Sequence, residues 1–209
     1  MSTSDGVGAR VVQTAGPVLI IGSGLLGASL GLALRAGGVR VYLEDASPTS
    51  LRLASDVGAG LAFGDVLAEA GVRPRECGSD TPSYQAPSIV VVATPPDVAD
   101  RVIVESLLRF PGAIVTDVAS VKDAVVADVL RGLEREGRLE EASRYVGSHP
   151  MAGRERSGAG AADADLFYGR PWVIVAHEST WPRAVLVARA LATDVGAVPL
   201  EMNAGTHDH

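Results

Sequence analysis

Residues 18–27 read VLIIGSGLLG, and this stretch decides the fold class. It starts with an apolar, partly β-branched run that is typical of a short buried strand. Gly22, Gly24 and Gly27 then match the pattern G-x-G-x-x-G, and Ala and Leu recur at helical spacing as far as Arg35. The stretch therefore predicts a strand, a tight glycine turn and a helix.

The same alternation of strand and helix continues along the chain. Short apolar runs predict buried strands, and longer amphipathic runs predict helices. After the first pair we expect strands at 39–43, 89–93, 113–116, 145–147, 172–176 and 198–200, and helices at 47–55, 95–110, 121–136 and 181–195. Because each crossover helix lies on a parallel sheet, the predicted fold is α/β, a Rossmann-like, doubly wound, mostly parallel sheet in three layers.

The pattern predicts one main domain over residues 17–202. Residues 1–16 mix Ser, Asp, Gly and Arg and predict a flexible lead without the features of a signal peptide. Residues 58–87 are rich in Gly, Pro, Ser and Asp, with helical character only at 65–70. We therefore expect an insertion or a long surface loop at 58–87.

Composition and charge exclude several classes of protein. The 209 residues are 47% hydrophobic and 21% charged, which is typical of a soluble globular protein. The 18 Lys and Arg residues against 25 Asp and Glu residues provide no basic field for nucleic acid. Glycines interrupt the apolar runs well before the ~20 residues that span a membrane. With Cys77 as the single cysteine, we expect no disulfide within the chain and a cytoplasmic protein.

The glycine turn is the first candidate site. Gly22 permits a sharp turn, Gly24 permits close approach of phosphates to the backbone, and Gly27 permits the helix to pack on the strand. Free backbone N–H groups at the start of the helix suit a pyrophosphate. A glycine-rich turn that binds nothing is the alternative. We expect a dinucleotide cofactor in contact with Gly22, Ser23, Gly24, Leu25, Leu26 and Gly27.

Asp45 indicates which dinucleotide is bound. It lies eighteen residues beyond Gly27, at the end of the second predicted strand, where a carboxylate accepts hydrogen bonds from ribose hydroxyls. An acid at this position repels a 2′-phosphate, and Ala46 follows where a phosphate binder would have Arg or Ser. These residues predict NAD rather than NADP.

Two further turns at the same sheet edge carry polar candidates. We expect Thr94 and Pro95, which follow the strand at 89–93, to contact the cofactor. Thr94 as the cap of a helix that starts with proline is an equally good explanation. Ser120 follows the strand at 113–116 and is either a ligand-facing hydroxyl or an N-cap, and spacing alone favours the cap.

A third turn contains a histidine. His149 lies in the segment GSHPMAGRE, residues 147–155, which is a stiff loop after a predicted strand. Its imidazole can exchange a proton near neutral pH, although a lone loop histidine is more often structural or solvated. The sequence His207-Asp208-His209 is too short for a preorganised metal site, so we predict no metal.

Residues 27–31, GASLG, also match the G-x-S-x-G pattern of hydrolases. In those enzymes the serine stands at a sharp turn between strand and helix. Ser29 instead falls inside the first predicted helix, which disfavours a hydrolase.

Four segments together resemble the prephenate dehydrogenase family, in which prephenate or arogenate is the substrate. They are residues 22–30, 117–122, 147–155 and 207–208, and the similarity extends from Val18 to the C-terminus. The motif G-S-H-P-M-A-G-x-E is the most specific of them. The resemblance implies a nucleotide-binding domain that uses NAD in the oxidative decarboxylation of prephenate to 4-hydroxyphenylpyruvate, a step of tyrosine biosynthesis.

The resemblance also implies roles for single residues. His149 is expected to hydrogen-bond and deprotonate the ring hydroxyl of a small-molecule substrate. Ser120 is expected to orient His149 and to touch both substrate and cofactor. Glu155 matches an acid that helps to gate the pocket, and Lys122 stands where a cation helps to hold a carboxylate or caps a helix. None of these residues decides between prephenate and arogenate.

Two features depart from the family pattern. The stretch 58–87 is longer than the family needs, and the chain stops at His209, where the family continues into a helical C-terminal domain. We expect residues 203–209 to begin the connection to that domain, and a homodimer only where the domain is present. An arogenate dehydrogenase and a non-catalytic NAD-binding module are alternatives. Another small-acid dehydrogenase, with a catalytic Lys on a later helix, fits the His149 loop less well.

Overall fold

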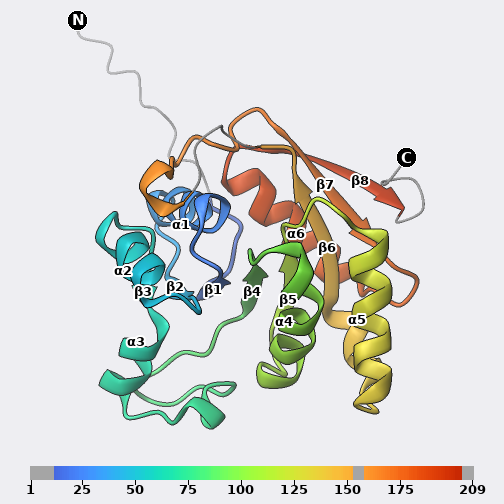
Figure 1. Ribbon diagram of the computed structural model, residues 1–209, viewed down its shortest axis with the longest axis horizontal. Coiled ribbons are helices and arrows are strands. Elements are labelled where there is room, and N and C mark those ends of the chain that lie inside the picture. Colours follow the sequence, from blue (N-terminus) through green and yellow to red (C-terminus); the bar gives the residue numbers. More distant parts are fainter. Residues whose placement is uncertain (1–11, 153–157, 204–209) are drawn as a thin grey trace, which may run out of the picture.

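The computed structural model describes residues 12–152 and 158–203 and contains one eight-stranded sheet. The strand order is β3-β2-β1-β4-β5-β6-β7-β8 (Figure 1). Neighbouring strands are parallel except for β6 and β7, which are antiparallel. The mostly parallel α/β fold predicted from the sequence is thus confirmed. The strands are β1 (Val18–Ile21), β2 (Val41–Glu44), β3 (Leu61–Ala62), β4 (Ile89–Val92), β5 (Ile114–Asp117), β6 (Tyr145–Pro150), β7 (Pro171–Ala176) and β8 (Val198–Asn203).

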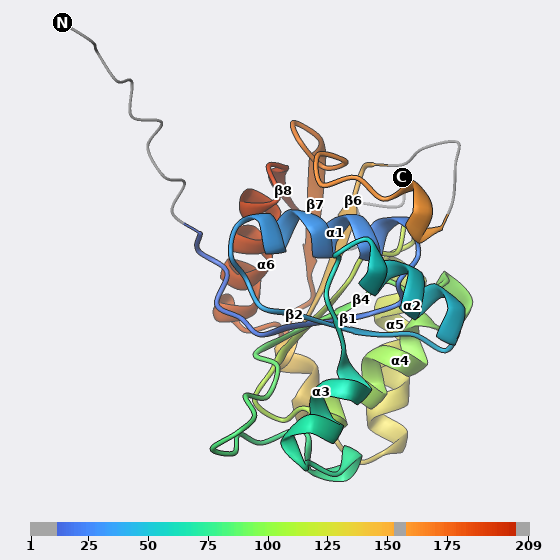
Figure 2. The ribbon, with the colours of Figure 1, turned by 90° about the vertical axis from the view of Figure 1, so that its left-hand side faces the viewer.

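Helices cover both faces of the sheet. Helices α1, α2 and α6 lie on one face, and α3, α4 and α5 lie on the other, which gives three layers (Figure 2). None of the helices that the structure describes has the length and apolar character needed to cross a membrane. They are α1 (Leu25–Ala36), α2 (Pro48–Asp56), α3 (Phe63–Ala70), α4 (Pro96–Arg109), α5 (Asp123–Arg135) and α6 (Pro182–Asp194).

The apolar strands separate two hydrophobic cores. Successive side chains of a strand point to opposite faces of the sheet. In β1, Val18 and Ile20 therefore join the core beneath α1 and α6, whereas Leu19 joins the core beneath α4 and α5. Because both faces are covered, these strands are continuously apolar rather than alternating, which is the pattern read from the sequence.

The parallel strands end in register at one edge of the sheet. Ile21 pairs with Glu44 on one side and with Val92 on the other, and Val92 pairs with Asp117. The turns that follow β1, β2, β4 and β5 therefore meet along a single line. Ligands of open α/β sheets bind outside this carboxyl edge.

The segment 58–87 differs from the insertion or long loop expected from its composition. It contains the edge strand β3 and the helix α3, followed by a 3-10 turn at Pro74–Glu76. Phe63, Cys77 and Tyr84 are buried in the core beneath α4. The segment is therefore part of the sheet and of the core. Its composition conceals this, because the few apolar residues that anchor it are widely spaced.

The beginning of the described chain packs against α6. The backbone N–H groups of Gln13 and Thr14 donate to Asp194 Oδ2 over 2.9 and 2.6 Å. This part of the expected flexible lead is thus attached to the domain. Residues 1–11 of that lead, and 204–209 of the expected connection, lie outside the described residues.

Candidate nucleotide-binding site

Two glycines shape the turn between β1 and α1. Gly22 has a φ of 101°, in the left-handed region, and a Cβ at this position would lie 2.5 Å from the carbonyl oxygen of Ala93. A Cβ at Gly27 would lie 1.9 Å from the carbonyl oxygen of Gly22. The turn therefore requires glycine at both positions, because α1 and β4 pack directly against its backbone.

The N-terminus of α1 faces open space. Gly24 is the N-cap, no side chain caps the helix, and its first turn carries no acidic residue. A Cβ at Gly24 would meet none of the described atoms within 4 Å. The first N–H groups of a helix have no intrahelical acceptor and carry partial positive charge. This helix start is therefore suited to an anionic group such as a phosphate.

A cavity of about 780 Å³ opens in front of the glycine turn. Its walls are the glycine turn, the end of β2, the turn after β4 and one flank of α4. Ser23 and Gly27 are buried and are not among its lining residues. The size falls within the ~300–1,000 Å³ typical of cofactor and ligand pockets. Among the residues predicted to bind a cofactor, those that line the cavity are Gly22, Gly24, Leu25, Leu26, Asp45, Thr94 and Pro95.

Asp45 follows β2 and is held at the cavity wall. The N–H and the hydroxyl of Ser23 both donate to Asp45 Oδ2 over 2.6 Å. The N–H of Ser47 donates to Asp45 Oδ1 over 2.7 Å. The Asp45 side chain remains partly exposed, and the neighbouring Ala46 is exposed. A fixed negative charge thus stands where the sequence pattern predicts it.

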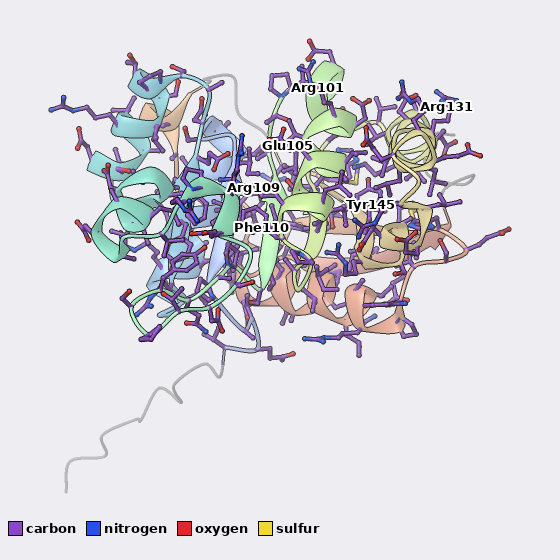
Figure 3. The ribbon with its side chains drawn as sticks, turned by 90° about the horizontal axis from the view of Figure 1, so that it is seen from below. Arg101, Glu105, Arg109, Phe110, Arg131 and Tyr145 are labelled. Atoms are coloured by element: carbon purple, nitrogen blue, oxygen red, sulfur yellow. The ribbon has the colours of Figure 1, made fainter. Side chains whose placement is uncertain are left out.

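The charged flank of α4 forms a wall of the cavity that the motifs do not predict. Arg101, Glu105 and Arg109 line the cavity from the flank of α4 that faces α2 and α3 (Figure 3). They are four residues apart, so they lie on one side of the helix, and this periodicity is the signal that the sequence contained. The α4 wall therefore carries charges of both signs, and Glu44 and Asp45 add negative charge at the end of β2.

Arg109 connects α4, β2 and the segment 58–87. Its Nη1 donates to both carboxylate oxygens of Glu44 over 2.8 and 3.0 Å, and its Nε donates to Cys77 Sγ over 3.3 Å. The guanidinium also lies over the rings of Phe63 and Phe110, 5.4 and 4.9 Å from their centroids. Burial opposes the charge of Arg109, but the hydrogen bonds and charge interactions with Glu44 and Cys77 together outweigh burial and raise the pKa of Arg109. The Arg109 side chain is therefore held by contacts with β2, α3 and the segment 58–87.

Thr94 has a buried hydroxyl at the cavity wall. Within the described residues, its Oγ1 has no hydrogen-bond partner. The N-cap of α4 is Pro95, and no side chain caps that helix, so the explanation of Thr94 as a helix cap is wrong. Buried hydroxyls are normally hydrogen-bonded, and a polar group of a bound ligand would satisfy this one.

Comparison with known proteins identifies the family. A model of the family described as "Prephenate dehydrogenase, nucleotide-binding domain" matches residues 30–201. The chain belongs to the prephenate dehydrogenase family. The match extends from within α1 into β8, and β1 and the glycine turn precede it.

Individual members of the family agree with this assignment. The chain is 38% identical over 190 residues to the probable prephenate dehydrogenase NovF of Streptomyces niveus. The aligned region covers 91% of this chain and 46% of NovF. It thus spans less than half of that relative. It is similar to the crystal structure of prephenate dehydrogenase from A. aeolicus in complex with hydroxyphenyl propionate and NAD⁺, with a TM-score of 0.73 and 26% identity over 91% of this chain and 61% of the other. A Synechocystis arogenate dehydrogenase shares the fold, with a TM-score of 0.72 and 24% identity over 91% and 61% of the two chains.

Ser120 and Lys122, which the resemblance to prephenate dehydrogenases places near the substrate, lie in the loop between β5 and α5. Ser120 is exposed, and the N-cap of α5 is Lys122 without a side-chain cap, so the explanation of Ser120 as a cap is wrong. Lys122 is fully buried and forms an ion pair with Asp117. Its ammonium is thus held inside the protein beside Asp117, and the expected contact with a substrate carboxylate stays a prediction.

His149 of the prephenate dehydrogenase motif is half-buried near the end of β6. The hydroxyls of Thr116 in β5 and Ser148 in β6 lie 2.9 Å apart, which joins the end of β5 to the residue before His149. His149 thus lies within β6 rather than in the expected loop after it, and Ser120 follows the neighbouring strand β5. Neither residue lines the cavity in front of the glycine turn. Glu155 lies outside the described residues.

Ser29 is not the nucleophile of a hydrolase. It is fully buried within α1, and its Oγ accepts a hydrogen bond from the N–H of Asp163 over 3.0 Å. A nucleophile elbow needs an exposed serine at a strand-to-helix turn. The hydroxyl of Ser29 instead attaches α1 to the chain that follows β6.

Proposed function

We propose that this chain binds NAD in the cavity in front of the glycine turn, as the cofactor-binding part of an NAD-dependent prephenate dehydrogenase. The observation that carries the proposal is the placement of Asp45, a fixed carboxylate beside exposed Ala46 at the cavity wall. A carboxylate at this position accepts ribose hydroxyls and repels a 2′-phosphate. The free N-terminus of α1 lies in the same cavity and supplies donors for a pyrophosphate.

The residues of the cavity fit the parts of a dinucleotide. The open space in front of Gly24 admits a phosphate to the backbone of the first turn of α1. The buried hydroxyl of Thr94 has no hydrogen-bond partner among the described residues and is available for a polar group of the dinucleotide. Apolar side chains of the glycine turn and of α4, Leu25, Val98 and Val102, supply surface for a flat ring. We therefore assign the predicted cofactor-binding residues, Ser120 included, to this edge of the sheet.

The proposed reaction is the oxidative decarboxylation of prephenate. NAD, when bound, supplies the hydride acceptor. We assign to His149 the removal of the proton from the ring hydroxyl of the substrate, because an imidazole exchanges protons near neutral pH. We assign to Ser120 the orientation of that imidazole, and to Glu155 a place beside the substrate. Loss of CO₂ makes the ring aromatic and drives the reaction forward.

A titration tests the cofactor half of the proposal. The purified chain is titrated with NAD and with NADP by calorimetry, and we expect saturable binding of NAD at one site and weaker binding of NADP. Prephenate and then arogenate are added to the NAD-bound sample, and the absorbance of the reduced cofactor is followed. Turnover with prephenate supports the complete proposal. NAD binding without turnover assigns only cofactor binding to these 209 residues, and absence of NAD binding contradicts the proposal.

A further inference from the structure

Ser23 is fully buried, yet both of its donors point to one acceptor. Its backbone N–H and its hydroxyl donate to Asp45 Oδ2, each over 2.6 Å. The two residues are 22 positions apart and lie in the turns that follow two adjacent strands, β1 and β2. The turn that faces the phosphates and the acid that faces the ribose are therefore joined by a direct contact.

The opposite oxygen of the same carboxylate is also held. The N–H of Ser47 donates to Asp45 Oδ1 over 2.7 Å, and Ser47 is the N-cap of α2. A carboxylate has about four lone-pair sites, and three of them are engaged by these protein donors. Both oxygens of the Asp45 side chain are thus held, and one acceptor site of Oδ1 remains for a ligand.

We infer that Ser23 is a positioning residue, which fixes the carboxylate of Asp45 and thereby sets the preference for a dinucleotide without a 2′-phosphate. The inference rests on the proposed function, because it concerns NAD in the same cavity. Ser23 does not line the cavity itself, so its hydroxyl acts through Asp45. The second residue of the glycine motif thus has a specific task in this chain.

The physical reason is preorganisation. An Asp45 carboxylate without the Ser23 hydroxyl loses one charge-assisted hydrogen bond and can rotate away from the ribose position. Holding an acceptor in its bound orientation before binding reduces the entropy lost when the ligand arrives. A carboxylate that can turn away also repels a 2′-phosphate less strongly. The hydroxyl should therefore strengthen NAD binding and weaken NADP binding relative to it.

The test is a double-mutant cycle read by calorimetric binding of NAD and NADP. The proteins are the unmodified chain, Ser23→Ala, Asp45→Ala and the double variant. We expect Ser23→Ala to raise the Kd for NAD about tenfold and to reduce the ratio of NADP to NAD dissociation constants. In the Asp45→Ala background the same change should alter the Kd for NAD less than about twofold, because the group through which Ser23 acts is gone.

A matched control is provided by Ser29→Ala. This change also removes a fully buried hydroxyl from the same strand-turn-helix unit, but its partner is Asp163 rather than Asp45. We expect Ser29→Ala to leave the Kd for NAD unchanged. Ser23→Cys, which keeps the size of the side chain but donates weakly, should shift the Kd in the same direction as Ser23→Ala and serves if the alanine variant does not fold.

The outcomes separate this inference from the proposed function. If Ser23→Ala weakens NAD binding equally with and without the Asp45 side chain, Ser23 acts independently of Asp45 and the inference is overturned. Unchanged NAD and NADP affinities in folded Ser23→Ala and Ser23→Cys would overturn it as well, while the proposed function would stand. Absence of NAD binding by the unmodified chain would overturn both.

Discussion

Lys122 and Asp117 form an ion pair in which neither side chain is exposed to solvent. Asp117 ends β5 at the carboxyl edge of the sheet, and Lys122 is the residue before α5. The N–H of Ala119 donates to Asp117 Oδ2 over 3.0 Å, and the hydroxyl of Tyr145 donates to Oδ1 over 2.9 Å. Burial, and then the charge of Asp117, raise the pKa of Tyr145 well above its usual value. The pair thus fixes the loop that presents Ser120.

Removal of the lysine should therefore destabilise the protein. Lys122→Met leaves Asp117 charged and buried without its cation, and we expect a loss of about 3–5 kcal/mol in the free energy of unfolding by urea. Arg131→Ala breaks an exposed ion pair with Asp128 and is the matched control, with an expected change below about 1 kcal/mol. Equal losses in the two variants would contradict a structural role for the buried pair.

Asp45→Ala should change the cofactor preference. The variant loses a fixed acceptor for the ribose and the charge that repels a 2′-phosphate. We expect the Kd for NAD to rise about ten- to a hundredfold and the Kd for NADP to rise less, measured by calorimetry. An unaltered ratio of the two dissociation constants would remove Asp45 from the determinants of specificity.

His149→Asn should separate chemistry from cofactor binding. Asparagine keeps a polar side chain in β6 but cannot take up a proton as an imidazole does. Where prephenate is turned over, we expect kcat to fall by about 10²–10⁴ while the Kd for NAD stays the same. A variant with unchanged kcat would exclude His149 as the base.

Replacement of two glycines of the turn by alanine should have different effects on stability. A Cβ at Gly27 would lie 1.9 Å from the carbonyl oxygen of Gly22, whereas a Cβ at Gly24 would meet none of the described atoms within 4 Å. Gly27→Ala should therefore lower the free energy of unfolding by about 1–3 kcal/mol and weaken NAD binding. Gly24→Ala should keep its thermal stability and weaken NAD binding alone, because the methyl group occupies the space of the cofactor. Unfolding scans and calorimetric titrations of both variants measure these effects.

His177 should make stability depend on pH. Burial lowers the pKa of His177 below the ordinary 6.5 and outweighs the backbone contacts with Ala142 and Tyr145 that raise it. The unfolded chain thus takes up the proton at a higher pH than the folded chain. The contribution of this residue is present above pH 6.5 and is lost as the pH falls through the folded pKa.

Urea unfolding at about pH 7.5 and about pH 5.5 measures this dependence. We expect the unmodified protein to lose more stability between the two values than His177→Gln, which has no titratable ring. The same loss in both proteins would assign the pH dependence to other groups.

The strand-turn-helix pattern could be predicted because its causes are local. The β1 run, the glycine turn and α1 lie within residues 18–36, and their apolar periodicity and glycine spacing need no distant partner. The edge strand β3 was not predicted, since two residues carry no periodicity of their own. It exists because Leu43 and Tyr42 of β2 offer it a parallel partner.

The candidate site likewise contains residues whose place follows from the sequence and residues whose place depends on tertiary packing. The cavity-lining role of Asp45 follows from its spacing after the glycine motif, since the end of β2 must lie beside the end of β1. The charged flank of α4 has a helical period, but only the packing of α4 beside β2 brings Arg109 to Glu44, 65 residues away. Lys122 has the sequence position of a substrate ligand, yet its ammonium is directed inward to Asp117.

The sequence by itself determined the fold class and the family, because hydrophobic period, glycine spacing and short motifs act within a few tens of residues. Only the tertiary structure decided which charges are paired and which face the cavity. Ser23 holds Asp45 because the sheet order places the turns after β1 and β2 side by side, and Arg109 holds Glu44 because α4 packs beside β2. Lys122 is close to Asp117 in the chain, but only the packing of the loop after β5 directs its ammonium inward. Ion pairs and hydrogen bonds act over a few ångströms, so the packing of the elements decides which charged groups become partners.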